Sequence, residues 1–208
     1  MLIQILPFRK NDHRLQKSYQ IFLDQYSKTG QLEIIKEDAL EISATESEKL
    51  KDYKIVANIP YYITGALIEK FLTEKNSPKS ITFLVQKEVG ERIMSRDKKE
   101  SILSISIKVF GKPKYISTVP KGAFVPAPKV DSAIIHIADV SNKIFEENKI
   151  TEQRFFEVVK AGFAHKRKQL GSNLEGIVSK QKFEQCGIDI KIRAEKLSVE
   201  DWICLAQD

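Results

Sequence analysis

The stretch Asn58-Ile59-Pro60-Tyr61 combines residue types that could bind an exocyclic amine. Pro60 fixes its own φ angle and restricts Ile59 to extended conformations, so the carbonyls of this segment are held away from regular pairing. An amine such as adenine N6 is a poor nucleophile because its lone pair is delocalised into the ring. If the Asn58 side-chain oxygen and the carbonyl of Ile59 or Pro60 accepted both N6 hydrogens, they would favour a tetrahedral nitrogen. Tyr61 could then stack on the base, although the four residues alone also fit a strand-ending turn with a buried tyrosine.

The elements that must position these residues are strands alternating with helices. Apolar runs at 32–37, 54–57 and 80–86 predict strands, and patterns at 43–52, from 64 onward and at "KEVGERIM" predict helices. This alternation is typical of a doubly wound, mainly parallel α/β sheet, in which ligands bind beyond the carboxyl ends of the strands. Asp38 and Asn58 are therefore expected to face one crevice. Asp38 could accept hydrogen bonds from an adenine amino group or a ribose hydroxyl, or it could simply form a turn or cap a helix.

The pattern changes after residue 100. "SILSISIKVF" reads as either helix or strand, and "PKYISTV" and "DSAIIHIADV" predict strands that close the sheet in antiparallel fashion. Residues 139–151 are polar, and every apolar pattern beyond them has helical spacing. We therefore predict an α/β domain over residues 1–140 and a small all-helical domain over residues 151–208.

Composition limits the classes of protein to which the chain could belong. With 208 residues and 42% hydrophobic content, the chain can bury one substantial core and a small appended domain. No apolar run is long enough to span a membrane and no signal peptide is evident, which predicts a cytoplasmic location. Cys186 and Cys204 lack CxxC spacing and the three histidines are scattered, so reduced thiols and no metal site are expected. The net charge of +6 suits a polyanionic partner, but it also fits a well-solvated, lysine-rich surface.

Several ordered stretches resemble a known family. Residues 58–61 match the [NDS]-[IVLP]-P-[YFW] motif of S-adenosylmethionine-dependent amino-group methyltransferases. "FLVQKEVGERI" (83–93), "GAFVPAPKVDSAII" (122–135), "FAHKRKQLGSNL" (163–174) and "GIDIKIRAEKLSVEDW" (187–202) narrow the match. From about Asp12 to its end, the chain resembles the ribosomal RNA adenine N6,N6-dimethyltransferases that modify two adjacent adenines near the 3′ end of small-subunit rRNA.

The resemblance implies roles for particular residues. Asn58 and the carbonyls of Ile59 and Pro60 would orient N6, while Tyr61 and Phe124 would hold the adenine ring. The cofactor would be S-adenosylmethionine, contacted by Asp38 and Asn58. Without the resemblance, Phe124 reads as a packing aromatic in a turn and the basic cluster near 167 as a solvated helix end. The resemblance places four residues on the RNA: Lys129, Lys166, Arg167 and Lys168.

Two family features are missing from this sequence. Complete members begin with an RNA-binding arm and a strand followed by a glycine-rich turn that approaches the methionine part of the cofactor, whereas the first glycine here is Gly30. Aligning "KNDHRL" (10–15) places Lys10 where the family has the acid that binds the ribose hydroxyls, and a cation cannot accept those hydrogen bonds. The first dozen residues look unlike the expected strand. We therefore expect a fragment that lacks the first strand and binds the cofactor weakly.

The sequence thus predicts a monomeric rRNA adenine dimethyltransferase involved in ribosome biogenesis, impaired by truncation. Its partner would be small-subunit rRNA or a precursor of the small subunit, with no membrane association. Two other functions stay open: a non-catalytic rRNA-binding or ribosome-assembly protein, and a macrolide-resistance methylase acting on large-subunit rRNA. A chain that has no stable fold is a further possibility, since loss of a central strand exposes apolar surface and unpaired backbone.

Overall fold

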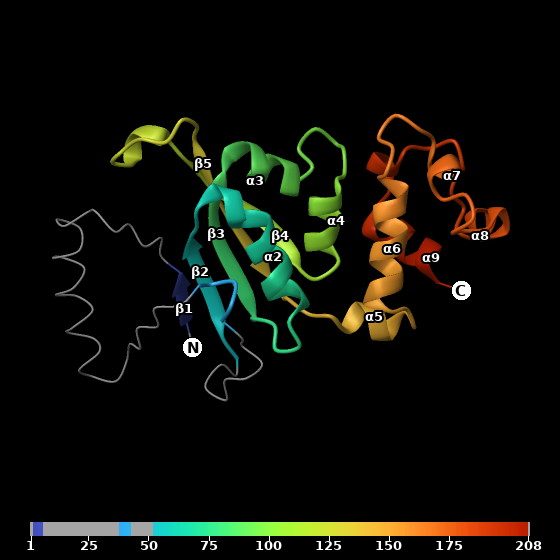
Figure 1. Cartoon of the computed structure of the whole chain (residues 1–208), viewed down its shortest axis with the longest axis horizontal. Coiled ribbons are helices and arrows are strands. Elements are labelled where there is room, and N and C mark those ends of the chain that lie inside the picture. The colour runs from blue at the N-terminus through green and yellow to red at the C-terminus, as the bar shows by residue number, and fades with distance from the viewer. Residues whose placement is uncertain (1, 6–37, 43–51, 208) are drawn as a thin grey trace.

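A five-stranded mixed sheet is the centre of the fold (Figure 1). The computed structural model describes residues 2–5, 38–42 and 52–207. Three neighbouring strands are parallel and two further strands close the sheet antiparallel, as the sequence predicts. In their order across the sheet, the strands are β1 (Leu2–Ile5), β2 (Lys54–Asn58), β3 (Ser80–Gln86), β5 (Ser132–Ala138) and β4 (Lys112–Val119).

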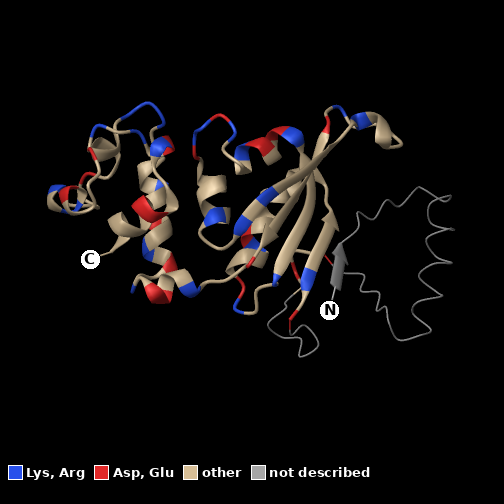
Figure 2. Ribbon diagram, turned by 180° about the vertical axis from the view of Figure 1, so that it is seen from behind, with Lys and Arg blue, Asp and Glu red and all other residues tan. Residues whose placement is uncertain are grey.

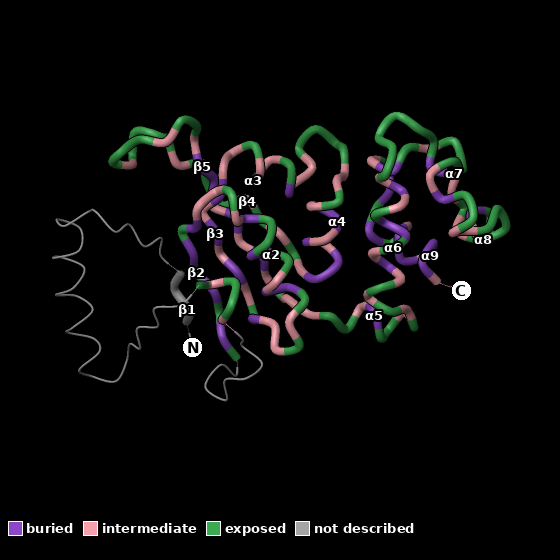
Figure 3. Tube along the Cα trace, viewed as in Figure 1, coloured by how far each residue is buried: buried purple, intermediate pink, exposed green. Residues whose placement is uncertain are grey.

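Alternating side chains send one set of residues from each central strand into the core. The buried set includes Ile55, Phe83 and Ile135, and their burial favours the strand because one face meets a helical layer. Three helices cover that face: α2 (Thr64–Thr73), α3 (Lys87–Ile93) and α4 (Ile102–Lys108) (Figures 1 and 3). The predicted strands at 54–57 and 80–86 are confirmed. The predicted strand at 32–37 and helix at 43–52 lie outside the described residues, except for Asp52.

Residues 102–108, which the sequence left open between helix and strand, form α4. Ser101 caps its N-terminus by accepting a hydrogen bond from the Ser104 backbone, while the Ser104 side chain accepts one from the Ser101 backbone. This reciprocal capping box satisfies two backbone donors that an α-helix otherwise leaves unpaired. The cap explains why an Ile-Ser alternation that resembles a strand is helical here.

The first residues correct one expectation. Leu2–Ile5 forms β1, which pairs in parallel with β2 from Leu2↔Lys54 to Ile5↔Ala57. The opening residues had looked unlike a strand, but the run LIQI is apolar enough to serve as one. Pairing satisfies backbone groups on the outer side of β2 that would otherwise be unpaired. The position beside β2 is therefore occupied by a strand from this chain.

The helical region begins after β5 and contains five α-helices among the described residues. Thr151 caps α6, and an aromatic cluster of Phe110, Phe145, Phe155 and Phe156 joins α6 to the sheet region. The predicted polar linker therefore contains a helix that contributes Phe145 to this cluster. The bounds are α5 (Lys143–Glu147), α6 (Glu152–Gly162), α7 (Leu170–Asn173), α8 (Lys180–Gln185) and α9 (Val199–Ala206). No helix among the described residues is long and apolar enough to cross a membrane.

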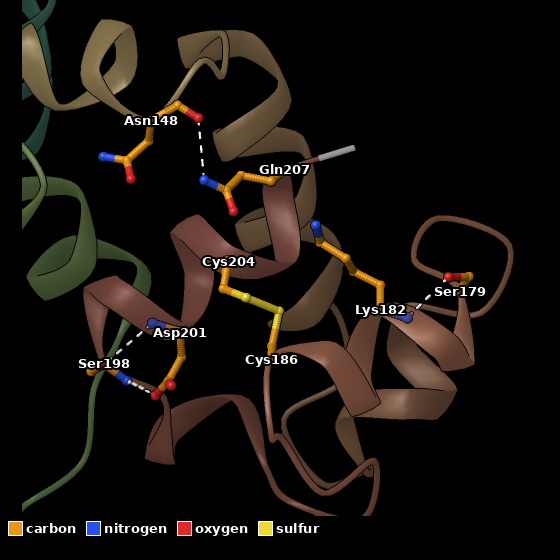
Figure 4. The surroundings of a disulfide bond; sticks show 8 residues. All are labelled: Asn148, Ser179, Lys182, Cys186, Ser198, Asp201, Cys204 and Gln207. Atoms are coloured by element: carbon orange, nitrogen blue, oxygen red, sulfur yellow. Dashed lines mark hydrogen bonds between the residues drawn. A yellow bond between two sulfur atoms is a disulfide. The ribbon is translucent and has the colours of Figure 1, made fainter.

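The two cysteines correct a second expectation. Cys186, at the end of α8, and Cys204, in α9, form a disulfide with an S–S distance of 2.02 Å and a Cα–Cα distance of 5.9 Å (Figure 4). Reduced thiols had been predicted because the cysteines lack CxxC spacing. They are 18 residues apart in sequence, and the packing of α9 beside the end of α8 brings them within the range that a disulfide spans. Sequence spacing alone does not contain this tertiary contact.

Candidate active site

Residues 58–61 lie at the carboxyl end of β2. Asn58 is the last residue of the strand, opposite Leu84 of β3, and its side chain is exposed without a hydrogen bond to other described residues. Ile59 is buried at 2% exposure and fixes the segment to the core. Pro60 is extended, with φ −58° and ψ 133°, and precedes the 3₁₀-helix η2 (Tyr61–Ile63). The chain therefore presents a polar amide directly beside a rigid turn.

The two candidate carbonyl acceptors differ in their surroundings. The Pro60 carbonyl accepts a hydrogen bond from the Ile63 amide at 3.2 Å, which closes the 3₁₀ turn. No turn hydrogen bond among the described residues uses the Ile59 carbonyl. The sequence could not choose between these carbonyls. The geometry favours Ile59 as the main-chain partner of Asn58, since its carbonyl precedes the closed turn.

The Tyr61 side chain is held by a hydrogen bond to the start of β5. Its hydroxyl lies 2.7 Å from the Oγ of Ser132, the completely buried first residue of β5. The Asp131 carbonyl accepts a hydrogen bond from the Lys87 amide at 3.0 Å, so the start of β5 is also joined to the start of α3. The sequence interpretation assigned Tyr61 only a stacking role. The structure adds a hydrogen bond that sets where its ring can lie.

The loop between β4 and β5 carries Phe124 and Lys129. It contains the 3₁₀-helix η3 (Lys121–Ala123), whose first amide donates to the Asp131 carboxylate at 3.0 Å. Phe124 follows η3 and is half-buried, whereas Lys129 is exposed. Because Tyr61 bonds to Ser132 at the end of this loop, the structure brings the loop base and the segment 58–61 together. The loop extends beyond the sheet edge in Figure 1.

A shallow depression borders the same loop. Lys129 lines it together with Lys87 and Lys121, and three acidic side chains balance the formal charge of these lysines: Glu88, Glu91 and Asp131. A mixed-charge surface of this kind can contact both the phosphates and the polar groups of a nucleic acid. The RNA contact predicted for Lys129 would therefore be made from this mixed-charge surface.

Asp38 lies in a turn, which was the alternative to its predicted contact with a ligand. Its Oδ1 accepts a hydrogen bond from the Leu40 amide at 2.9 Å, and its carbonyl accepts from the Glu41 amide at 2.8 Å. These bonds make Asp38 a turn former. The side chain is exposed, and no hydrogen bond to other described residues uses its second carboxylate oxygen. No hydrogen bond among the described residues joins Asp38 to the segment 58–61, and Lys10 lies outside the described residues.

The predicted RNA-binding cluster Lys166, Arg167 and Lys168 lies in an exposed loop between α6 and α7, in the helical region. The Asn173 side-chain amide donates to the carbonyls of Gly162 and His165, which holds both sides of this basic loop. The structure therefore does not join this cluster to the segment 58–61. Both nevertheless lie toward the upper edge of the molecule in Figure 1, one after β2 and the other between α6 and α7.

Further Lys and Arg residues lie along that edge, between the segment 58–61 and the basic loop 166–168. Figure 2 shows Lys and Arg on the loop before α4, on the basic loop and on the loop that carries Phe124. Arg96 stacks over the ring of Tyr115 at 3.9 Å and pairs with Glu91 at 3.5 Å, whereas Lys99 lies 3.8 Å from Glu195. The sequence interpretation did not single out residues 96–99, where three cations accompany one acid, Asp97.

A polar network holds the loop before α4. Glu100 accepts hydrogen bonds from Lys108 at 2.6 Å, Ser104 at 2.6 Å and Ser95 at 2.7 Å. Burial acts to raise the pKa of Glu100, but these hydrogen bonds and the Lys108 charge lower it below its ordinary value. The Glu100 amide also donates to the Glu195 carbonyl at 2.8 Å, which joins the loop to the helical region.

Ser132 and Asp131 are the site residues that sequence reasoning missed. Both lie in the quoted stretch "KVDSAII", so the signal was present, but neither residue type suggested a partner. Ser132 is 71 residues from Tyr61, a separation at which the sequence alone cannot indicate a hydrogen bond.

The fold is that of Rossmann-like methyltransferases. A solved dimethyladenosine transferase from Plasmodium falciparum has a TM-score of 0.74 at 22% identity, covering 97% of this chain and 79% of its own. The 23S rRNA methyltransferase ErmE has a TM-score of 0.73 at 20% identity, covering 99% and 80%. These likenesses establish the fold and do not separate the two kinds of substrate.

Sequence comparison identifies the family. The family model described as "Ribosomal RNA adenine dimethylase" matches residues 11–207, so the chain belongs to that family. The ribosomal RNA small subunit methyltransferase A of Dehalococcoides mccartyi is 41% identical over 161 residues, 74% of this chain and 55% of that protein. The protein of the same name from Fusobacterium nucleatum is 37% identical over 185 residues, 86% and 69% respectively. The chain thus spans little more than half the length of the first of these relatives.

Proposed function

We propose that this chain supplies the adenine-binding and RNA-facing parts of an S-adenosylmethionine-dependent enzyme that dimethylates two adjacent adenines near the 3′ end of small-subunit rRNA. One observation carries the proposal: the exposed Asn58 amide ends β2 beside a rigid turn, and Tyr61 of that turn bonds to Ser132 at the base of the Phe124 loop. The matched relatives are named for the small subunit, which favours that substrate over large-subunit rRNA.

The chain's own residues would orient the amine. The Asn58 side-chain oxygen and the Ile59 carbonyl would accept the two N6 hydrogens, favouring a tetrahedral nitrogen whose lone pair is no longer delocalised into the ring. Such acceptors act most strongly when charge develops on nitrogen, so they favour the transition state over the bound substrate. Pro60 keeps the turn rigid, and the rings of Tyr61 and Phe124 would hold the base taken out of its stack.

S-adenosylmethionine would supply the methyl group. Asp38 and Asn58 are the described residues that we assign to it, because each presents an exposed oxygen that can accept from a hydroxyl or amino group. One oxygen of Asp38 is already used by its own turn, which leaves the other for such a contact.

Contact with rRNA would run along the basic edge. We assign phosphate contacts to Lys129, Lys166, Arg167 and Lys168, all of which are exposed and form no ion pair with other described residues. We also propose that residues 1–140 act as the catalytic domain, that residues 151–208 act as an RNA-binding domain, and that the chain works as a monomer. The net charge of +6 supports binding to a polyanion.

The test is methyl transfer by the purified protein to small ribosomal subunits that lack the modification, read by mass spectrometry of the rRNA. Asn58→Ala should slow transfer by about 100-fold or more, the loss typical when a group that stabilises developing charge is removed. Asn142→Ala is the matched control, because Asn142 is also exposed and its side chain caps no helix. An undiminished rate for Asn58→Ala would refute the assigned role.

The other functions give different results in the same experiment. Binding to subunits without methyl transfer, together with no saturable binding of S-adenosylmethionine by calorimetry, would indicate a non-catalytic rRNA-binding protein. Methyl transfer to large-subunit rRNA alone would indicate the macrolide-resistance type of activity.

A further inference from the structure

The two most exposed large hydrophobic side chains of the described residues flank the candidate active site. Val125 is 91% exposed and Tyr62 is 88% exposed, whereas the next, Ile116, is 50% exposed. Tyr62 directly follows Tyr61 and Val125 directly follows Phe124. The two exposed side chains therefore adjoin the two aromatic residues assigned to the adenine ring.

The geometry of η2 separates the two tyrosines. A 3₁₀-helix has about three residues per turn, so consecutive side chains leave the axis roughly 120° apart. The Tyr61 hydroxyl is directed to Ser132, which is buried at the start of β5. Tyr62 therefore leaves in another direction, and its hydroxyl forms no hydrogen bond with other described residues. Its ring faces are open to solvent.

Val125 is presented from a braced loop. The base of the loop is fixed by the bond between the Lys121 amide and the Asp131 carboxylate, and the Phe124 amide donates to the Lys121 carbonyl at 3.3 Å. An exposed aliphatic side chain on a fixed loop can contact a ligand with little loss of conformational freedom. Lys121 and Lys129 on the same loop are exposed cations, which suits a ligand whose apolar base faces are joined by a phosphate backbone.

We propose that Tyr62 and Val125 form an apolar rim around the adenine site, and that this rim holds the bases next to the target adenine in an unpaired RNA segment. The inference rests on the proposed function and extends it to the neighbouring nucleotides. A base taken out of its stack leaves its neighbours with uncovered faces. Tyr62 stacks on one such face and Val125 contacts the other side of the strand. The rim thereby selects unpaired RNA over duplex, because paired bases offer no free face.

The test measures binding of a short, fluorescently labelled single-stranded RNA with two adjacent adenines, by anisotropy without cofactor. Tyr62→Ala should weaken binding about tenfold, within the range for loss of one base–aromatic stack. Tyr62→Phe should stay within about twofold because the ring that stacks is kept. Val125→Ser should weaken binding about threefold through lost apolar contact. Ile116→Ala, in the edge strand β4, is the matched control for an exposed aliphatic side chain.

Several results would overturn the rim. Equal affinity of wild type and Tyr62→Ala would do so, as would a loss no larger than that of Ile116→Ala, or no measurable binding by the wild type. A dimer in sedimentation that Tyr62→Ala dissolves would show that the rim binds a second copy of the chain. Because binding is read without methyl transfer, failure of the rim and failure of the proposed activity appear in separate measurements.

Discussion

The hydrogen bond between Tyr61 and Ser132 should couple the two halves of the site energetically. Tyr61→Phe keeps the ring but removes the hydroxyl, leaving the completely buried Ser132 Oγ without its partner at 2.7 Å. We expect the free energy of unfolding to fall by about 1–2 kcal/mol, the range for a lost hydrogen bond that leaves a buried group unsatisfied. Ser132→Ala should cost about 0.5–1 kcal/mol, since the half-buried Tyr61 hydroxyl can turn toward water.

Urea unfolding of both single variants and the double variant measures the coupling directly. The double variant should lose about 1 kcal/mol less than the sum of the two single losses, because the second substitution removes a group whose partner is already absent. Tyr62→Phe controls for removal of a tyrosine hydroxyl in the same turn, and it should leave the unfolding free energy within about 0.5 kcal/mol. Strictly additive losses would show that the two residues do not interact and that the loop is positioned in some other way.

Three further predictions concern charge. Glu100→Gln should lower the unfolding free energy at pH 7 by about 1–2 kcal/mol, because the amide bonds Lys108 more weakly than the carboxylate does. The folded pKa of Glu100 lies below its unfolded value, so the carboxylate contributes stability above the unfolded pKa. The difference in unfolding free energy between wild type and Glu100→Gln should therefore vanish as the pH falls through the folded pKa. Burial and then the Glu69 charge raise the pKa of Glu152, so Glu152→Gln should raise Tm at pH 7 and lose that advantage in acid, where both states are protonated; an unchanged Tm at pH 7 would contradict this. Replacing Lys166, Arg167 and Lys168 with Ala should reduce the slope of log K against log salt for rRNA duplex binding by about 2–3, whereas an unchanged slope would exclude phosphate contacts there.

The sequence predicted the parts of the fold that depend on local hydrophobic pattern. Short apolar runs that include Ile55 and Phe83 indicated strands, and the structure buries both side chains. The run at 102–108 was ambiguous because its Ile-Ser alternation satisfies a strand, and only the cap at Ser101 identifies it as a helix. β1 was missed because four residues are too few to show a period, and pairing with β2 supplies what the local pattern lacks.

The same distinction applies to the candidate site, where local chemistry predicts some residues and tertiary packing determines the partners of others. Motif and turn chemistry located Asn58 and Pro60, since a proline after an extended residue limits the backbone wherever it occurs. The sequence could not decide between two carbonyls, because that choice depends on the Ile63 amide closing a turn onto Pro60. It could not pair Tyr61 with Ser132, or Cys186 with Cys204, because each contact is made by tertiary packing. Local chemistry can therefore suggest a group that would bind the amine, whereas the groups that hold that candidate in position follow from which elements the fold places side by side.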